Sequence, residues 1–130
     1  FFQMAVEKCE ESLNTNPNHK LTLRNCAQLL TFLGGALQGK SGDWNSPTMK
    51  RANSYYVRAL RADPHDAHST FQYARFLAFC RRSELAEDYF LKTLELDPHF
   101  ERCLQEYGAF LRQLGKTDAA ERIAALVGTH

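Results

Sequence analysis

Apolar residues recur at spacings of three and four through most of the chain, which is typical of amphipathic α-helices. Three segments show the pattern: residues 21–33, 67–80 and 101–114. In the first of them the apolar residues are Leu23, Cys26, Leu30 and Leu33. Each segment is therefore predicted to be a helix that buries one face against its neighbours.

Proline and glycine indicate where these helices begin and end. Ser46 precedes Pro47, which gives a capping residue followed by proline at the first helical position. Gly34-Gly35 and Gly115 predict helix ends. Turns into the following helices are marked by Asn16-Pro17, Asp63-Pro64 and Asp97-Pro98.

The segment 52–65 recurs 34 residues later as 86–99. The two copies share Ala52 and Ala86, Tyr55 and Tyr89, Leu60 and Leu94, and Asp63-Pro64-His65 and Asp97-Pro98-His99. A period of this length indicates stacked supersecondary units. Toward the N-terminus the offset is 47, so 13 additional residues lie between Pro17 and Ala52. We therefore predict an inserted loop at residues 35–46.

At these positions the chain resembles the tetratricopeptide repeat family, whose unit is a helix–turn–helix. The family's first helix, helix A, carries an aromatic residue or Leu followed by Gly or Ala; helix B carries Ala, an aromatic residue and a closing Pro. The unit that ends at Pro98 matches with Tyr73-Ala74, Leu77, Ala86 and Phe90. The unit that ends at Pro64 matches with Cys26-Ala27, Leu30, Ala52, Tyr56 and Ala59.

The resemblance implies an all-α solenoid of about seven antiparallel helices, an orphan helix B followed by three A/B pairs. We expect residues 1–130 to form one such domain. Because the chain opens inside a repeat and lacks an initiator Met, we interpret it as a fragment of a longer protein. The core register predicted from the repeat places Ala27, Ala52, Tyr56, Ala74, Ala86, Phe90 and Gly108 at helix contacts.

Charge and cysteine usage narrow the partner classes. A net charge of +1 with interleaved acids and bases argues against nucleic acid as the partner. No apolar run approaches the roughly 20 residues of a membrane span, so no membrane partner is expected. The four cysteines form no CxxC pair, and Cys9, Cys26 and Cys80 fall at core positions. Buried free thiols favour a reducing compartment, the cytoplasm or the nucleus.

No residue pattern predicts catalysis, a cofactor or a metal. The segment His65-Asp66-Ala67-His68 contains metal-ligating residue types. We interpret it as a polar turn followed by a helix start, because a metal site would need a third and a fourth ligand and the sequence indicates neither. We therefore expect a protein that is not an enzyme.

The resemblance implies a protein–protein interaction module, a scaffold or peptide-binding domain that uses the concave face lined by helices A. The predicted peptide-binding residues on this face are Arg24, Gln28, His68, Phe71, Gln72, Arg75, Arg102 and Arg112. Arginine pairs with carboxylates in a bidentate way, and phenylalanine offers an apolar contact. An acidic peptide with apolar side chains is the partner hypothesis, and solvated arginines without a ligand are the alternative.

One known site of the family is a carboxylate clamp that holds the acidic C-termini of heat-shock chaperones. The matching positions here hold Arg24, Gln28, Gln72, Arg102 and Glu106. Glu106 reverses the last basic residue of the clamp and would repel a terminal carboxylate. Chaperone C-termini are therefore not the expected partner.

Other readings stay open at this stage. Trp44, the only tryptophan, lies in the inserted loop. It either folds back onto the helices or anchors a partner, because tryptophan buries a large area in a desolvated pocket. The domain could also be a targeting or regulatory part of a larger multidomain enzyme, and the orphan helix and last repeat could mediate self-association.

Overall fold

The computed structural model describes residues 2–35 and 41–127. Residues 36–40 of the predicted loop lie outside the described residues. The described part of the chain forms these helices: α1 (Phe2–Thr15), α2 (Lys20–Leu33), α3 (Pro47–Ala62), α4 (Ala67–Phe79), α5 (Ser83–Leu96), α6 (Glu101–Gln113) and α7 (Thr117–Ala124).

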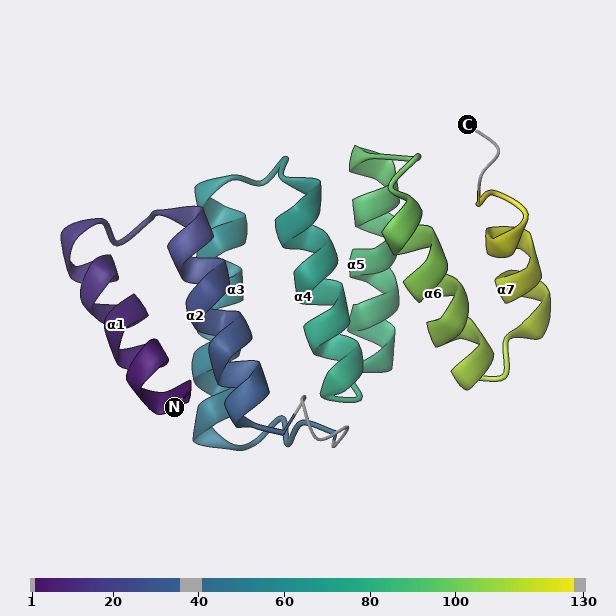
Figure 1. Ribbon diagram of the computed structural model, residues 1–130. Helices are drawn as coiled ribbons and strands as arrows, with labels where there is room; N and C mark the ends of the chain where they lie inside the picture. The colour runs from purple at the N-terminus through teal and green to yellow at the C-terminus, as the bar shows by residue number, and fades with distance from the viewer. Residues whose placement is uncertain (1, 36–40, 128–130) are drawn as a thin grey trace.

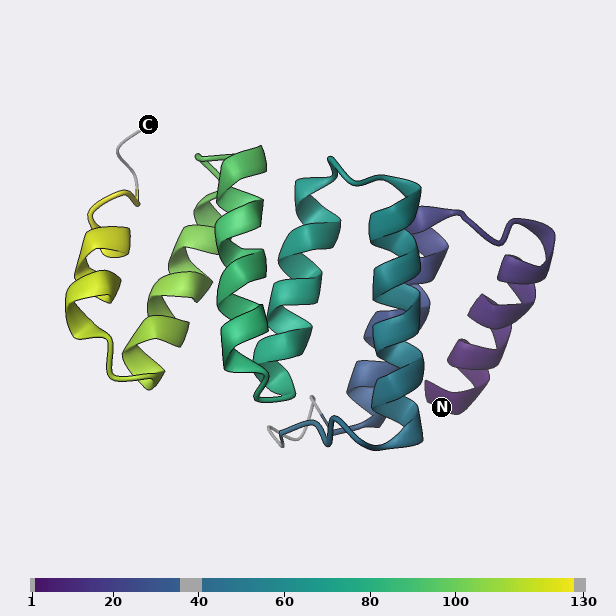
Figure 2. The ribbon, with the colours of Figure 1, turned by 180° about the vertical axis from the view of Figure 1, so that it is seen from behind.

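Successive helices run antiparallel and stack into one array, with the two ends of the chain at opposite ends of it (Figure 1). Helices α2, α4 and α6 all run in the same direction and share one side of the array. Helices α3 and α5 form the opposite side, which faces the viewer in Figure 2. The most extensive contacts join α2 to α3 and α4 to α5, which are the two helix pairs of the repeats matched in sequence. The predicted all-α solenoid of helix pairs is confirmed.

The repeated Asp-Pro-His segments form the same turn twice. The backbone N–H of His65 donates to Asp63 Oδ1 at 3.2 Å, and that of His99 donates to Asp97 Oδ1 at 3.1 Å. In both segments the aspartate side chain accepts a hydrogen bond from the backbone N–H two residues later, which closes an Asx turn. At the start of α3, Ser46 Oγ accepts from the Met49 N–H at 3.1 Å and Pro47 is the first helical residue. The helix starts predicted from these residues are confirmed.

Small and aromatic residues alternate in the core, as the register predicts. Ala27, Ala52, Ala74 and Ala86 have no exposed surface. The absence of a longer side chain lets the helices approach, and aromatic rings fill the adjacent space. Tyr56, Phe90 and Gly108 are buried as well. The core register is therefore confirmed.

The cysteines lie within or beside this core. Cys26, Cys80 and Cys103 are buried, and Cys9 is half-buried. Removal from water raises the pKa of the Cys103 thiol to about 12, because burial disfavours the thiolate. In the ranges that the structure describes, no helix is long and apolar enough to cross a membrane.

The end of the inserted loop is attached to the second repeat. The Gly42 N–H donates to the Phe79 carbonyl at 3.0 Å, and Arg81 Nε donates to Ser41 Oγ at 3.0 Å. A Cβ atom at Gly42 would lie 2.6 Å from the Phe79 ring and 3.0 Å from Cys80 Sγ. Glycine is therefore required for the loop to approach the end of α4 so closely.

Candidate functional site

A pocket with a volume of about 400 Å³ opens between the three helices A. It lies along α2, α4 and α6, and one residue each from α3 and α5 also lines it. The lining residues are Gln28, Thr31, Phe32, Tyr56, Gln72, Arg75, Phe76, Ala78, Phe79, Phe90, Glu106, Ala109, Phe110 and Gln113. These three helices run in parallel, so their equivalent halves lie side by side. Most of the lining residues come from the C-terminal halves.

The N-terminal halves of the same helices carry ion pairs between neighbouring repeats. Arg24 Nη1 lies 3.3 Å from Asp66 Oδ2, and the two side chains are only 13% and 11% exposed. Lys20 Nζ lies 2.7 Å from Asp63 and 3.4 Å from Asp66. These four residues connect the start of α2 to the turn before α4.

Asp66 is also the cap of α4. Its carboxylate accepts from the His68 N–H at 3.1 Å and from Ser69 Oγ at 2.7 Å. Burial alone would raise the pKa of this carboxyl, but the Ser69 bond and the charges of Arg24 and Lys20 outweigh it and lower the pKa. Asp66 is thus held ionised at the helix N-terminus, where the helix dipole favours negative charge.

Glu106 compensates two of the predicted peptide-binding arginines. Its carboxylate lies 2.9 Å from Arg75 Nε and 3.3 Å from Arg102 Nε. With Arg24 paired to Asp66, three of the four predicted arginines face a carboxylate of the chain itself. The fourth, Arg112, is exposed on α6 and has no ion pair within the described residues. These ion pairs form two groups, one around Asp66 and one around Glu106, and we name them together the ionic network: Lys20, Arg24, Asp63, Asp66, Arg75, Arg102 and Glu106.

The prediction that Phe71 offers an apolar contact on the concave face is wrong. Its side chain is only 2% exposed. The ring packs against Phe100 with 5.0 Å between centroids, and the guanidinium groups of Arg75 and Arg102 lie 5.5 Å and 5.7 Å from its centre. Phe71 is therefore a core residue beneath the ionic network, because Phe100 at the start of α6 folds over it.

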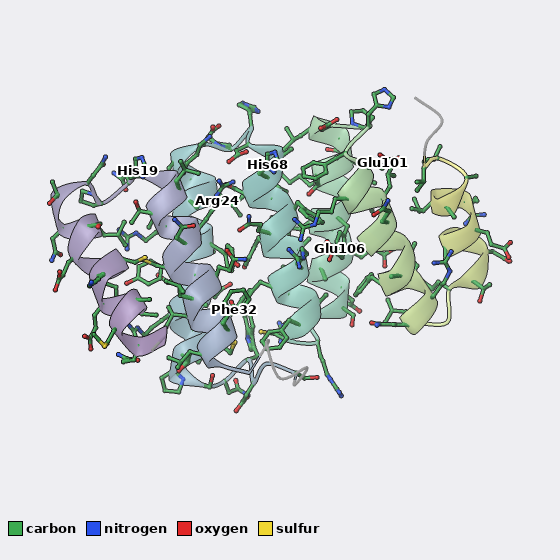
Figure 3. All side chains as sticks on the ribbon, viewed as in Figure 1. His19, Arg24, Phe32, His68, Glu101 and Glu106 are labelled. Carbon is green, nitrogen blue, oxygen red and sulfur yellow. The ribbon has the colours of Figure 1, made fainter. Side chains whose placement is uncertain are left out.

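The remaining predicted residues take different places around the pocket. Gln28, Gln72 and Arg75 line it. Gln72 Oε1 is buried and accepts no hydrogen bond from any described group. His68 is exposed beside the ionic network, with its ring edge against Phe100 at 5.0 Å between centroids. Figure 3 shows Arg24 and His68 toward one end of the face and Phe32 toward the other.

Trp44 lies outside the pocket lining, at the end of the inserted loop. Its ring packs 6.3 Å from that of Phe76, and the Arg82 guanidinium lies 4.9 Å from its centre. Of the two readings of the loop, the structure has Trp44 folded against the helices. Its role as an anchor for a partner is still a hypothesis that no contact here tests.

Phe32, near the end of α2, was missing from the predicted site. Phe32 and Phe79 both line the pocket and are separated by 47 residues, the offset between the first two repeats. The same position in the third repeat is Gln113, a further 34 residues on, and it also lines the pocket. This recurrence is the signal in the sequence that could have located the pocket.

The helix order, the repeated turns and the packing register define a tetratricopeptide-type helical solenoid. No family model and no curated protein matches the chain. Solved structures with this fold are similar in arrangement and distant in sequence, so the likeness establishes the fold.

Several of the similar structures are of MamA. MamA 41-end from Desulfovibrio magneticus RS-1 is 18% identical with a TM-score of 0.77, over 95% of this chain and 63% of that one. A second MamA crystal structure is 14% identical with a TM-score of 0.76, over 96% and 66%. A K341M mutant of the O-GlcNAc transferase from Thermobaculum terrenum is 18% identical with a TM-score of 0.68, over 85% and 19%. The chain thus spans about three-fifths of the first MamA chain and a fifth of the transferase.

Proposed function

We propose that the chain is a protein–protein interaction module that binds a segment of another protein on the face formed by α2, α4 and α6. The observation that carries the proposal is the pocket of about 400 Å³, which draws residues from all three helices. A pocket of this size is within the range of ligand sites. Stacked helical repeats commonly use this extended face for binding.

The arrangement of charge modifies the partner hypothesis. An acidic peptide was expected because four arginines share the face, and Arg24, Arg75 and Arg102 are already paired with carboxylates. An acidic partner would have to displace Asp66 or Glu106, or rely on Arg112. A partner that presents apolar side chains to the pocket fits the face better. The buried thiols support a reducing compartment as its setting.

A second candidate function is a targeting or regulatory domain within a larger enzyme. The likeness to a fifth of the Thermobaculum terrenum transferase chain favours it, because there the same fold is part of a chain named as an enzyme. Both candidates use the same face, and they differ in what the rest of the protein does.

The concave face is tested with a variant that fills the pocket. Ala109 is exposed and lines the pocket, so Ala109→Trp should block it with little cost to the core. Ala62→Trp, at the exposed end of α3, is the matched control. We expect purified candidate partners that bind the wild type to bind Ala62→Trp equally and to lose at least tenfold in affinity for Ala109→Trp, a loss of about 1.4 kcal/mol.

Equal affinity for the two variants would exclude the face as the binding site. Light scattering over a range of concentrations gives the remaining outcome. A mass that rises with concentration in the wild type and not in Ala109→Trp would identify the partner as a second copy of the chain.

A further inference from the structure

We propose that Cys9 and Cys26 form a disulfide when the protein meets a hydroperoxide, and that this crosslink ties α1 to α2. The crosslink goes beyond the proposed binding role and is independent of it, because neither cysteine lines the pocket. Three observations support it: the places of the two cysteines on the helix pair, the contact between their thiols, and the separation of the other two cysteines.

The helix pair brings the two cysteines to the same level. Helices α1 and α2 are antiparallel neighbours joined by a short turn, residues 16–19 (Figure 1). Cys9 lies six residues before the end of α1 at Thr15, and Cys26 lies six residues after the start of α2 at Lys20. Because an α-helix rises by about 1.5 Å per residue, both cysteines are about 9 Å along their helices from the turn. They therefore stand opposite each other.

Both side chains also belong to one apolar cluster. Cys26 is buried with Leu13, Leu23 and Ala59, and Cys9 packs against this cluster. Burial raises the pKa of the Cys26 thiol to about 12, and a hydrogen bond with the Cys9 thiol adds to that effect. Cys26 has no exposed surface, whereas Cys9 is half-buried. An oxidant can therefore reach one thiol of the pair from solvent, and the second thiol is in contact with the first.

The chemistry balances in two steps. First, the Cys9 thiol is oxidised to a sulfenic acid, and the hydroperoxide is reduced to an alcohol, or to water where the oxidant is hydrogen peroxide. Second, the sulfur of Cys26 attacks the sulfenic sulfur, the S–S bond forms, and the thiol proton leaves with the sulfenic hydroxyl as water. Cys26 alone would be inert, because burial disfavours its thiolate, so Cys9 is the site of the first oxidation.

The other two cysteines have no comparable neighbour. Cys80 caps the C-terminal end of α4, and Cys103 lies in the first turn of α6. Because α4 and α6 run in the same direction, these two thiols are at opposite ends of the helices. The Cys103 thiol is directed to the Phe90 carbonyl at 3.7 Å. All four cysteines of the sequence lie in the described ranges, and Cys9 with Cys26 is the pair that the geometry selects.

A crosslink at this place would act on the first helix of the array. Among the described helices, α1 has its extensive contacts with α2. Side-chain hydrogen bonds from Arg51 and Tyr55 to Glu10 attach it to α3 as well. An element with few neighbours opens locally more often than the centre of a fold. The disulfide would suppress the opening that separates α1 from α2.

The experiment treats the 130-residue chain with hydrogen peroxide, blocks the remaining thiols with N-ethylmaleimide in denaturant, and maps tryptic peptides by mass spectrometry. We expect blocked thiols at Cys80 and Cys103, and peptides of Cys9 and Cys26 joined by a bond that dithiothreitol cleaves. A non-reducing gel should show a single chain. Hydrogen exchange of the α1 amides should slow roughly tenfold or more on oxidation, while that of the α6 amides stays the same.

Two serine variants assign the bond. Cys9→Ser should leave Cys26 free after the same treatment, and Cys80→Ser, the matched control, should retain the crosslink. Three results in the wild type would overturn the inference. They are oxidation of Cys9 to a sulfinic acid with Cys26 still free, a bond that joins two chains, and an unmodified Cys9 at a peroxide concentration that oxidises free glutathione. A crosslink without any slowing of exchange in α1 would show that the bond forms and does not restrain the helix.

Discussion

The ionic network and the rest of the pocket differ in the side chains that they offer a partner. In the ionic network Arg24, Arg75 and Arg102 all have carboxylate partners within the chain. The rest of the pocket is lined by aromatic rings, glutamines and small residues, which carry no charge. The charges that suggested a binding site in the sequence are therefore already paired within the chain.

The location of the acids explains this difference. Asp63 and Asp66 belong to the turn before α4, and an acid near a helix N-terminus is stabilised by the helix dipole. Basic residues on the preceding helix A, Lys20 and Arg24, then find these acids close by. The turn chemistry that starts one helix thus neutralises the neighbouring helix.

The sharpest way to test the comparison is to truncate one phenylalanine beneath the ionic network and one that lines the pocket. Phe71, 2% exposed beneath Arg75 and Arg102, belongs to the core. Phe71→Ala should lower the free energy of unfolding by about 3–5 kcal/mol, because it leaves a cavity. Phe79→Ala should cost clearly less, since that ring is half-buried beside the open pocket. Chemical denaturation monitored by circular dichroism measures both.

The same two variants separate core from site. Phe79→Ala should weaken binding of a partner at the pocket that Phe79 lines, while the chain stays folded. If Phe71→Ala has a small effect on stability and abolishes partner binding instead, then Phe71 is a ligand contact and the structure's assignment of it to the core is wrong.

These outcomes reflect what a sequence pattern contains. The repeat predicts the helices and the buried positions Ala86 and Phe90, because small and aromatic residues recur with the same offsets. It predicts which helices share a face. It misplaces Phe71, because the position is polar in the other repeats, where Arg24 and Gln105 stand. Periodicity predicts the face of the helix on which a side chain lies, but it does not predict which residue covers that side chain. Phe71 is covered by Phe100, which comes from the next repeat.

The ion pairs of the ionic network could not be predicted from the sequence, for another reason. Arg24 and Asp66 are separated by 42 residues, and the predicted offsets align equivalent positions, which these are not. Their approach depends on the tilt between successive repeats. The hydrogen bond from the Gly42 N–H to the Phe79 carbonyl could not be predicted either, because the sequence of the loop does not indicate which helix end it contacts.

The next largest effect is expected from the acid that joins the ionic network to a helix cap. Asp66→Ala removes the cap of α4 and the partner of Arg24, and should cost about 2 kcal/mol, the upper end for a cap. Asp66→Asn keeps a good capping residue and removes only the charge, so it should cost less. Thermal and chemical unfolding at neutral pH measure the difference.

Acid should erase the difference between the wild type and Asp66→Asn. The pKa of Asp66 is lowered below its usual value of 3.8 in the folded state. The carboxylate's contribution is therefore complete above the unfolded pKa and is lost as the pH falls from about 4 through the folded pKa. Stability of the two proteins should converge over that range. A gap that persists well below it would show that packing, and not ionisation, accounts for the role of Asp66.

The smallest change in stability is expected for Glu106→Gln, a variant that should turn part of the ionic network into a site for an acidic peptide. Glu106→Gln leaves Arg75 and Arg102 uncompensated, and because these side chains are 38% and 63% exposed, stability should change by less than about 1 kcal/mol. Binding of a hexaglutamate peptide, measured by calorimetry at low salt, should strengthen roughly fivefold, because the two arginines no longer pair with Glu106 and about 1 kcal/mol of attraction becomes available to the peptide.

The control variant is Glu95→Gln, which is exposed on α5 on the opposite side of the array. It changes the net charge equally and should leave the affinity for the peptide within twofold. The gain should vanish near 1 M salt, where screening acts within about 3 Å. If the wild type binds the peptide as tightly as Glu106→Gln does, the ion pairs do not keep Arg75 and Arg102 from a ligand. That result would support an acidic partner.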